Sequence, residues 1–287
     1  MRPINLFSVK QILKDTYVVT ENYLPGHRCV CGVIVGAERI LVIDAGLGMG
    51  GDLRRFIESF VGTGKPIFLI CTHGHTDCIG GAALFDEAYL CHKDLPMVAD
   101  SLNQEFVLGQ MNGWTNHIPE LEAHAKLLAK DLSEVKFKDL HERDHYHLGG
   151  VHVEIRCIPG HTKGSVAVRV TREGVQTMTF VGDAFSAEMN HLTNMNKEDL
   201  LEYRDRLQQF LSGLYHDEPI FSAHLPVAVG ISVGEDIAKA CEEVALGRGT
   251  GQDAPFDFGW GKKGGEAPDL RVHFVNNNYI VYNKDLL

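Results

Sequence analysis

Four potential metal ligands lie within six positions of one short segment, His73-Gly-His75-Thr-Asp77-Cys78. The segment follows an apolar run at 66–71, which predicts a buried strand that ends just before the first histidine. The His-x-His spacing directs two imidazoles to the same side of an extended backbone, as chelation requires. A solvated turn that happens to hold two histidines is the alternative, and the added carboxylate and thiol favour a metal site over it.

Three further candidate ligands also follow apolar runs. His161 lies in the segment Pro-Gly-His-Thr-Lys-Gly-Ser, Asp183 closes a run that ends Val-Gly-Asp, and His224 follows the run at 219–223. In an open α/β sheet, ligands bind beyond the carboxyl ends of the strands. Together with the first four residues, they make seven nitrogen, oxygen or sulfur donors of the kinds that zinc accepts.

Alternating strands and helices would position these side chains. Apolar runs and a polar–apolar alternation predict strands at 16–20, 31–35, 40–44, 66–71 and 151–157. The order strand, turn, strand, Asp occurs at 31–44 and again at 165–183. We therefore expect an α/β fold built of two pseudo-equivalent halves that pack sheet to sheet, with helices outside.

We expect one domain that spans residues 1–287. Helices are predicted at 52–61, at 197–212 and around 237–244, and a hairpin at about 271–283. Residues of about 94–148 have the composition of a helical insertion between the halves. If this insertion covers the site, Phe106, Met111 and Trp114 lie near the substrate. Otherwise these aromatic and sulfur-containing side chains form the insertion's own core.

The composition excludes several classes of protein. Of the 287 residues, 44% are hydrophobic and 23% are charged, which suits a globular core. The net charge is -11 and no basic run occurs, so we expect a small-molecule substrate and neither nucleic acid nor a membrane as partner. No signal-peptide pattern or membrane-span-like stretch occurs, so a cytoplasmic location is expected. The seven cysteines fit that reducing compartment, and Cys29 and Cys31 are expected to pack in the core.

The order of these motifs resembles that of the metallo-β-lactamase superfamily. His-x-His-x-Asp, Pro-Gly-His-Thr-x-Gly-Ser, Gly-Asp and a late His follow one another as in that family, and the resemblance covers nearly the whole chain. It implies an αβ/βα sandwich of four layers, with two mixed β-sheets flanked by helices. The ligands that it implies are His73, His75 and His161 for one metal, and Asp77 and His224 for a second, with Asp183 bridging the two.

Cys78 departs from the family pattern, which usually has His at this position. A thiolate could replace the imidazole at the second metal, because Zn–S bonds of ~2.3 Å are as acceptable as Zn–N bonds of ~2.0–2.1 Å. Alternatively the shorter side chain does not reach, which leaves a mononuclear enzyme, or the site is degenerate. The other six positions are intact, which a dead site would not require. We favour ligation by Cys78.

The resemblance implies a metal-dependent hydrolase with one or two zinc ions. Bound zinc lowers the pKa of its water to ~7 and so supplies hydroxide at neutral pH. The expected substrates are small-molecule esters, lactones, thioesters or related compounds. Asp77 is the expected catalytic residue, because it can orient the nucleophile and move its proton while it binds metal. His191 is a candidate for the leaving-group acid, although a surface position is the commoner interpretation of such a histidine.

Two alternatives stay open. One is an iron-dependent oxidoreductase of the same fold, similar to persulfide dioxygenases, which needs only His and Asp ligands. Flavodiiron-type relatives usually have Glu where this chain has His75, which disfavours that branch. The other alternative is a metal-binding protein without catalysis. A second histidine cluster, His141, His145 and His147, is expected to be a solvated loop because no complementary donors accompany it.

Overall fold

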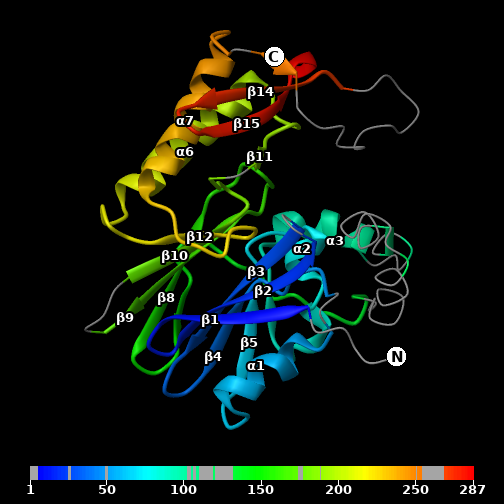
Figure 1. Ribbon diagram of the computed structural model, residues 1–287, viewed down its shortest axis with the longest axis vertical. Coiled ribbons are helices and arrows are strands. Elements are labelled where there is room, and N and C mark those ends of the chain that lie inside the picture. The colour runs from blue at the N-terminus through cyan, green and yellow to red at the C-terminus, as the bar shows by residue number, and fades with distance from the viewer. Residues whose placement is uncertain are drawn as a thin grey trace.

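The computed structural model describes residues 6–24, 27–48, 51–101, 105, 108–109, 119, 132–173, 177–187, 189–249, 251–253 and 268–287. The fold is α/β, as expected: two mixed β-sheets face each other, and helices lie outside them (Figure 1). A third, smaller sheet stands with two long helices at one end of this sandwich. In the described residues, no helix is both long and apolar enough to cross a bilayer.

The first sheet has six strands in the order of the chain. They are β1 (Phe7–Leu13), β2 (Thr16–Leu24), β3 (His27–Val35), β4 (Ile40–Ile43), β5 (Ile67–Ile70) and β6 (Ala88–Tyr89). β1 to β4 pair antiparallel, whereas β4, β5 and β6 pair parallel. β4 and β5 are buried at every position, which explains why their sequences are unbroken apolar runs without alternation.

The second sheet has five strands in the order β12-β10-β9-β8-β7. Their bounds are β7 (His145–His147), β8 (Val151–Cys157), β9 (Val166–Arg172), β10 (Thr177–Gly182) and β12 (Ile220–Ser222). The repeat inferred from the sequence is visible in the topology. β3 and β4 form an antiparallel pair and β4 then pairs parallel with β5; β9 and β10 likewise pair antiparallel, and β10 then pairs parallel with β12.

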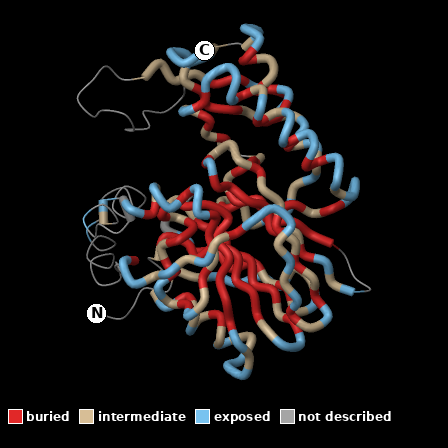
Figure 2. The backbone as a smooth tube through the Cα atoms, turned by 180° about the vertical axis from the view of Figure 1, so that it is seen from behind, coloured by how far each residue is buried: buried red, intermediate tan, exposed pale blue. Residues whose placement is uncertain are grey.

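The two sheets enclose one hydrophobic core. It includes Ile34 and Phe68 from the first sheet and Val153 and Phe180 from the second, and Figure 2 shows the buried strands at the centre of the molecule. At Gly32 a Cβ would lie 2.7 Å from the Phe180 ring, so the sheets approach this closely only because the residue is glycine. A second core lies on the outer face of the first sheet, under α1 (Leu53–Val61).

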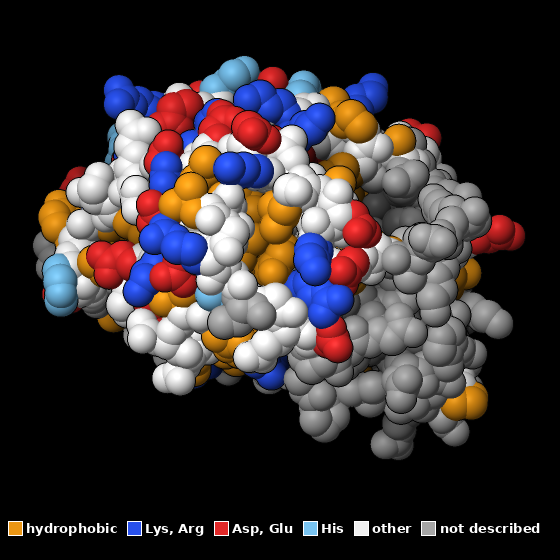
Figure 3. Space-filling view, turned by 90° about the horizontal axis from the view of Figure 1, so that it is seen from above, with side chains coloured by type: hydrophobic (Ala, Val, Ile, Leu, Met, Phe, Trp, Pro, Cys, Tyr) orange, Lys and Arg blue, Asp and Glu red, His pale blue; other side chains and the backbone are white. Residues whose placement is uncertain are grey.

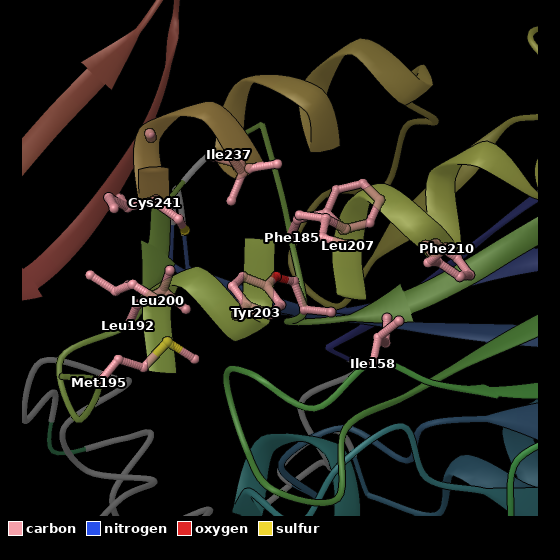
Figure 4. Close-up of a cluster of buried hydrophobic side chains, with 14 of the residues drawn as sticks. Ile158, Phe185, Leu192, Met195, Leu200, Tyr203, Leu207, Phe210, Ile237 and Cys241 are labelled. Atoms are coloured by element: carbon pink, nitrogen blue, oxygen red, sulfur yellow. The ribbon is translucent and has the colours of Figure 1, made fainter. Parts of the chain in front are cut away.

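The third sheet was not expected from the sequence. A hairpin lies where one was predicted, but two further strands join it. The four strands are β11 (Met189–His191), β13 (Gln252–Asp253), β14 (Leu270–Val275) and β15 (Asn278–Asn283). The helices α6 (Lys197–Ser212) and α7 (Ile231–Ala245) share a core with this sheet and with the end of β10, in which Tyr203, Leu207 and Ile237 pack together (Figure 4).

The remaining short helices lie near the histidine motif or at the chain end. They are α2 (Thr76–Ile79), α3 (Leu95–Ser101) and the 3₁₀ turns Ala82–Leu84, His92–Asp94 and Lys284–Leu286. The sequence of small residues from Gly80 to Phe85 predicts a helix, but these residues form only the 3₁₀ turn Ala82–Leu84, and α2 lies before them as a single turn. Phe106, Met111, Trp114 and about half of the predicted insertion lie outside the described residues. The segment of His145 and His147 is an edge strand and not a loop, although both side chains are exposed, as expected.

Candidate metal centre

Strand ends bring all seven predicted donors to one edge of the sandwich. His73 and His75 follow β5, His161 lies between β8 and β9, Asp183 directly follows β10, and His224 lies two residues beyond β12. Asp77 and Cys78 lie on the short helix α2, which begins immediately after His75. Their roles as ligands stay predictions, but the geometry allows a test of whether they suit a metal.

Three imidazoles form the first group of donors. His75 Nδ1 lies 3.0 Å from His73 Nε2 and 2.9 Å from His161 Nε2, and the three rings stand nearly perpendicular to one another. Burial lowers the pKa of His73 to about 3 and also lowers the pKa of His75, so both rings are neutral at pH 7. His161 Nδ1 faces the His191 carbonyl oxygen at 3.2 Å and therefore donates to it, which turns Nε2 toward the other two rings. Neutral rings with converging lone pairs are the form that binds a metal.

Two carboxylates and His224 form the second group. His224 Nε2 lies 3.1 Å from Asp77 Oδ2 and 3.2 Å from Asp183 Oδ2, while Nδ1 lies 2.8 Å from the Arg28 carbonyl oxygen. Since a carbonyl oxygen only accepts, Nδ1 carries a proton, and Nε2 faces two carboxylates. Burial alone would lower the pKa of His224, but the carboxylates raise it well above its usual value. The site thus needs a positive charge between these atoms, which a metal ion would supply.

Asp183 links the two groups. Its Oδ2 lies 3.8 Å from His73 Nε2 and 3.7 Å from His161 Nε2, in addition to its contact with His224. The preceding Gly182 has a φ of +56°, and a Cβ there would lie 2.2 Å from Thr72 Oγ1, so only glycine lets Asp183 take this position. Burial would raise the pKa of Asp183, but the nearby imidazoles hold it well below its usual range. The carboxylate is therefore placed to bridge two cations.

A second carboxylate at a strand end supports the motif without belonging to the donor groups. Asp44, directly after β4, accepts from Thr72 N at 2.7 Å and from Thr72 Oγ1 at 2.9 Å, which ties the end of β4 to the end of β5. Burial raises the pKa of Asp44 to about 7 against the opposing effect of these hydrogen bonds. Asp44 has a φ of +60°, a conformation that Asp tolerates better than most residues.

Asp94 connects the two histidine loops and was not identified from the sequence. Its side chain is completely buried and accepts from Gly74 N at 2.9 Å, from Thr162 Oγ1 at 2.6 Å and from Gly164 N at 2.7 Å. Gly74 lies between His73 and His75, and Thr162 follows His161. One carboxylate therefore fixes the distance between the loops that carry three of the donors. An isolated acid in a segment of helical composition gives no sequence signal for this role.

Two cysteines lie at the centre, and only one of them was expected there. Donor atoms of Cys78, His73 and Asp77 lie within 4.8 Å of one another, and so do those of Cys29, Asp77 and His224. Cys31 packs in the core on the outer face of the first sheet, as predicted, but Cys29 contacts the second donor group. Nothing in the sequence separates the two residues, because both occupy the same apolar strand.

A cavity of about 940 Å³ opens at the first donor group. His75, His161 and His191 line it together with apolar side chains that include Met97 and Met195. The surface position considered for His191 is wrong: the side chain is half-buried in the cavity wall, and burial lowers its pKa to about 4. The cavity is large enough for a small-molecule substrate to reach the donors.

Comparisons with known proteins found relatives that match about half of this chain. An uncharacterized protein of Mycobacterium tuberculosis is 30% identical over 165 residues, which are 55% of this chain and 70% of that protein. The human acyl-coenzyme A thioesterase MBLAC2 is 25% identical over 159 residues, 51% of this chain and 55% of that enzyme, so the match spans about half of its length.

Solved structures share the fold at low identity. A metallo-beta-lactamase from Pseudomonas aeruginosa, in a mono-zinc form, is 17% identical with a TM-score of 0.56, covering 84% of this chain and 96% of that one. A metallo-beta-lactamase family protein from Thermus thermophilus is 14% identical with the same TM-score, covering 83% and 80%. The family model described as the metallo-beta-lactamase superfamily matches residues 24–209, well over half of the sequence. The chain therefore belongs to the metallo-β-lactamase superfamily.

Proposed function

We propose that the chain is a metal-dependent hydrolase, with zinc as its metal, and that its substrates are thioesters of small molecules. The observation that supports this most strongly is that the cavity opens directly onto two of the donor residues. His75 and His161 belong to the first donor group and also line the cavity, so a substrate there lies beside the metal positions. A purely structural metal site would be closed to the cavity.

Each donor group has a distinct task in this proposal. A zinc ion held by the imidazoles would lower the pKa of a bound water to ~7 and polarise the scissile carbonyl. Asp77 lies beside His224 and close to the first group, so its carboxylate can orient the attacking water and accept its proton. His191, in the cavity wall, can donate an N–H to a substrate oxygen.

The chemistry of the leaving group favours thioesters over oxygen esters. A thioester releases a thiolate, whose conjugate acid has a pKa of ~8.5, so it departs at neutral pH with little help from a proton donor. An alkoxide is far more basic and needs a general acid. The likeness to acyl-coenzyme A thioesterases points in the same direction.

The distribution of charge on the surface also favours a small-molecule substrate over nucleic acid. On the end of the molecule that carries α7 and the third sheet, basic and acidic side chains are intermixed (Figure 3). This differs from the continuous basic surface with which proteins bind nucleic acid. Lys93 and Lys163 line the cavity with exposed side chains, where they can attract an anionic group of a substrate.

The test is thiol release from acyl-coenzyme A thioesters of short, medium and long chains, with matched oxygen esters in parallel. We expect thioester hydrolysis that chelation abolishes and zinc restores. His161→Ala should reduce it by at least about 100-fold, because a ligand is lost. His141→Ala is the matched control: this histidine is exposed and outside the donor groups, and its variant should keep full activity.

Two results would overturn the proposal. Hydrolysis that survives both chelation and His161→Ala would place the reaction elsewhere. Iron in the purified protein, with oxygen uptake on a persulfide and no thiol release from thioesters, would assign the site to the oxidative alternative instead.

A further inference from the structure

Two of the seven cysteines lie outside the hydrophobic cores. Cys31 and Cys71 belong to the core on the outer face of the first sheet, Cys91 to the core between the sheets, and Cys241 to the core of α6 and α7. Cys29 is 1% exposed and Cys78 is fully buried, yet neither belongs to any of these cores. Their thiols are buried among the polar groups of the donor site, so packing does not account for them.

Hydrogen bonds join the strand β3 to the loop of His224 at the residues before and after Cys29. The carbonyl oxygen of Arg28 accepts from His224 Nδ1 at 2.8 Å, and Val30 N donates to the Ala223 carbonyl oxygen at 2.7 Å. Cys29 lies between these two contacts. The register of the backbone therefore places Cys29 beside the His224 loop, and the Cys29 sulfur lies within 4.8 Å of the His224 donor nitrogen.

The donor distances suit one tetrahedral ion. Around zinc, bonds of ~2.0–2.3 Å place neighbouring donor atoms ~3.3–3.5 Å apart. The His224 nitrogen is 3.1 Å from the Asp77 oxygen and 3.2 Å from the Asp183 oxygen, and the Cys29, Asp77 and His224 donors all lie within 4.8 Å of one another. Cys29, Asp77 and His224 thus offer one sulfur, one oxygen and one nitrogen at distances that a single ion can span, and Asp183 adds a second oxygen beside His224.

Cys78 belongs to a different donor group. Its sulfur is 3.9 Å from Thr72 Oγ1, and that hydroxyl is hydrogen-bonded to Asp44. Cys78 shares a donor group with His73 and Asp77, but that group does not include His224. The residue that follows Asp77 in the motif therefore lies beside Thr72 and Asp77, but it is not grouped with His224.

We propose that Cys29, and not Cys78, is the sulfur ligand of the second metal, together with Asp77, His224 and the shared Asp183. A thiol from β3 then takes the place that the family motif gives to an imidazole on α2. Binding releases the thiol proton, because the ligand is the thiolate. The inference rests on the metal site of the proposed function but does not depend on the reaction.

Cobalt substitution tests the proposal, because a thiolate bound to Co²⁺ gives a sulfur-to-metal charge-transfer band in the near ultraviolet and a serine does not. We expect the band in the wild type and in Cys78→Ser, and its loss in Cys29→Ser, whose metal content falls from about two ions to about one per chain. Cys31→Ala, two residues along the same strand but in the core, is the matched control and should keep the band.

Loss of the band in Cys78→Ser, or two bound ions without any sulfur band in the wild type, would overturn the proposal. If Cys29→Ser does not fold, X-ray absorption of zinc-loaded Cys78→Ser decides the question. A sulfur at ~2.3 Å then supports Cys29, and a shell of nitrogen and oxygen alone contradicts it. Failure of thioester hydrolysis with the band intact would refute the proposed substrate and leave this assignment standing.

Discussion

Asp94→Asn is the substitution that most sharply tests how the two histidine loops are held. The native carboxylate receives three hydrogen bonds, two from backbone N–H groups and one from a hydroxyl. Asparagine has the same shape but only one acceptor oxygen. With that oxygen in the place of Oδ2, the bonds from Gly74 and Thr162 survive, and the new amide NH₂ meets the N–H of Gly164.

The cost follows from this geometry. One buried N–H is left without an acceptor, which costs ~1–3 kcal/mol, and the two surviving bonds lose the advantage of a charged acceptor, ~1 kcal/mol each. A neutral amide is cheaper to bury than a carboxylate, which offsets part of the loss. We expect the free energy of unfolding of the metal-free protein to fall by ~2–4 kcal/mol. Because the loops of His73 and His161 lose their common anchor, zinc affinity should fall ~10–100-fold.

The assay is urea unfolding of the chelator-treated protein, followed by zinc titration of the folded variant. Asp139→Asn is the matched control: this carboxylate also accepts from two backbone N–H groups, those of His92 and Leu140, but touches neither histidine loop. The control should lose at most ~1 kcal/mol and keep its zinc affinity. Wild-type zinc affinity in Asp94→Asn would refute the idea that this side chain positions the ligands.

Three further predictions concern the scaffold. Gly80→Ala should destabilise by ~1–3 kcal/mol in urea unfolding, because its Cβ would lie 2.4 Å from a carbonyl of the β4–α1 connection, whereas Gly64→Ala, with open space around it, should be neutral. Glu218→Ala should lower the free energy of unfolding by ~3–5 kcal/mol in the same assay, because Arg169 loses its buried partner. The two side chains are hydrogen-bonded at 2.7 and 3.0 Å. A loss under ~1 kcal/mol would contradict this. In the metal-free protein, Asp44 keeps its proton up to about pH 7 when folded and loses it near ~3.9 when unfolded, so the folded state binds more protons and stability should fall as pH rises through this window. Asp44→Asn should flatten that slope, and an unchanged slope would count against the buried acid as its source.

Local sequence patterns predicted much of the fold. The alternation in β8 and the unbroken apolar runs of β4 and β5 each record how many faces of a strand are buried, which is a local property. The repeat of strand, turn, strand and Asp likewise predicted two pseudo-equivalent halves that pack sheet to sheet, and β3–β4 and β9–β10 are the two matching hairpins. The third sheet was missed because β11 pairs with β15, which lies far along the chain: Met189 is paired with Tyr279.

The donor site was predictable only in part, and for a similar reason. The histidines and aspartates lie in motifs of fixed spacing, so the sequence could name them. Cys29 comes from β3, and its place beside His224 depends on contacts between segments that are 196 residues apart in the chain. Asp94 acts through hydrogen bonds to two loops that are distant in sequence. Neither relation leaves a local pattern.

The central claim is that these strand ends hold metal ions, and elemental analysis of protein purified without chelator tests it most directly. The geometry predicts about two zinc ions per chain, one for the three imidazoles and one for the group around His224. Protein that is folded but carries no transition metal, and that binds none when zinc is supplied, would contradict the account.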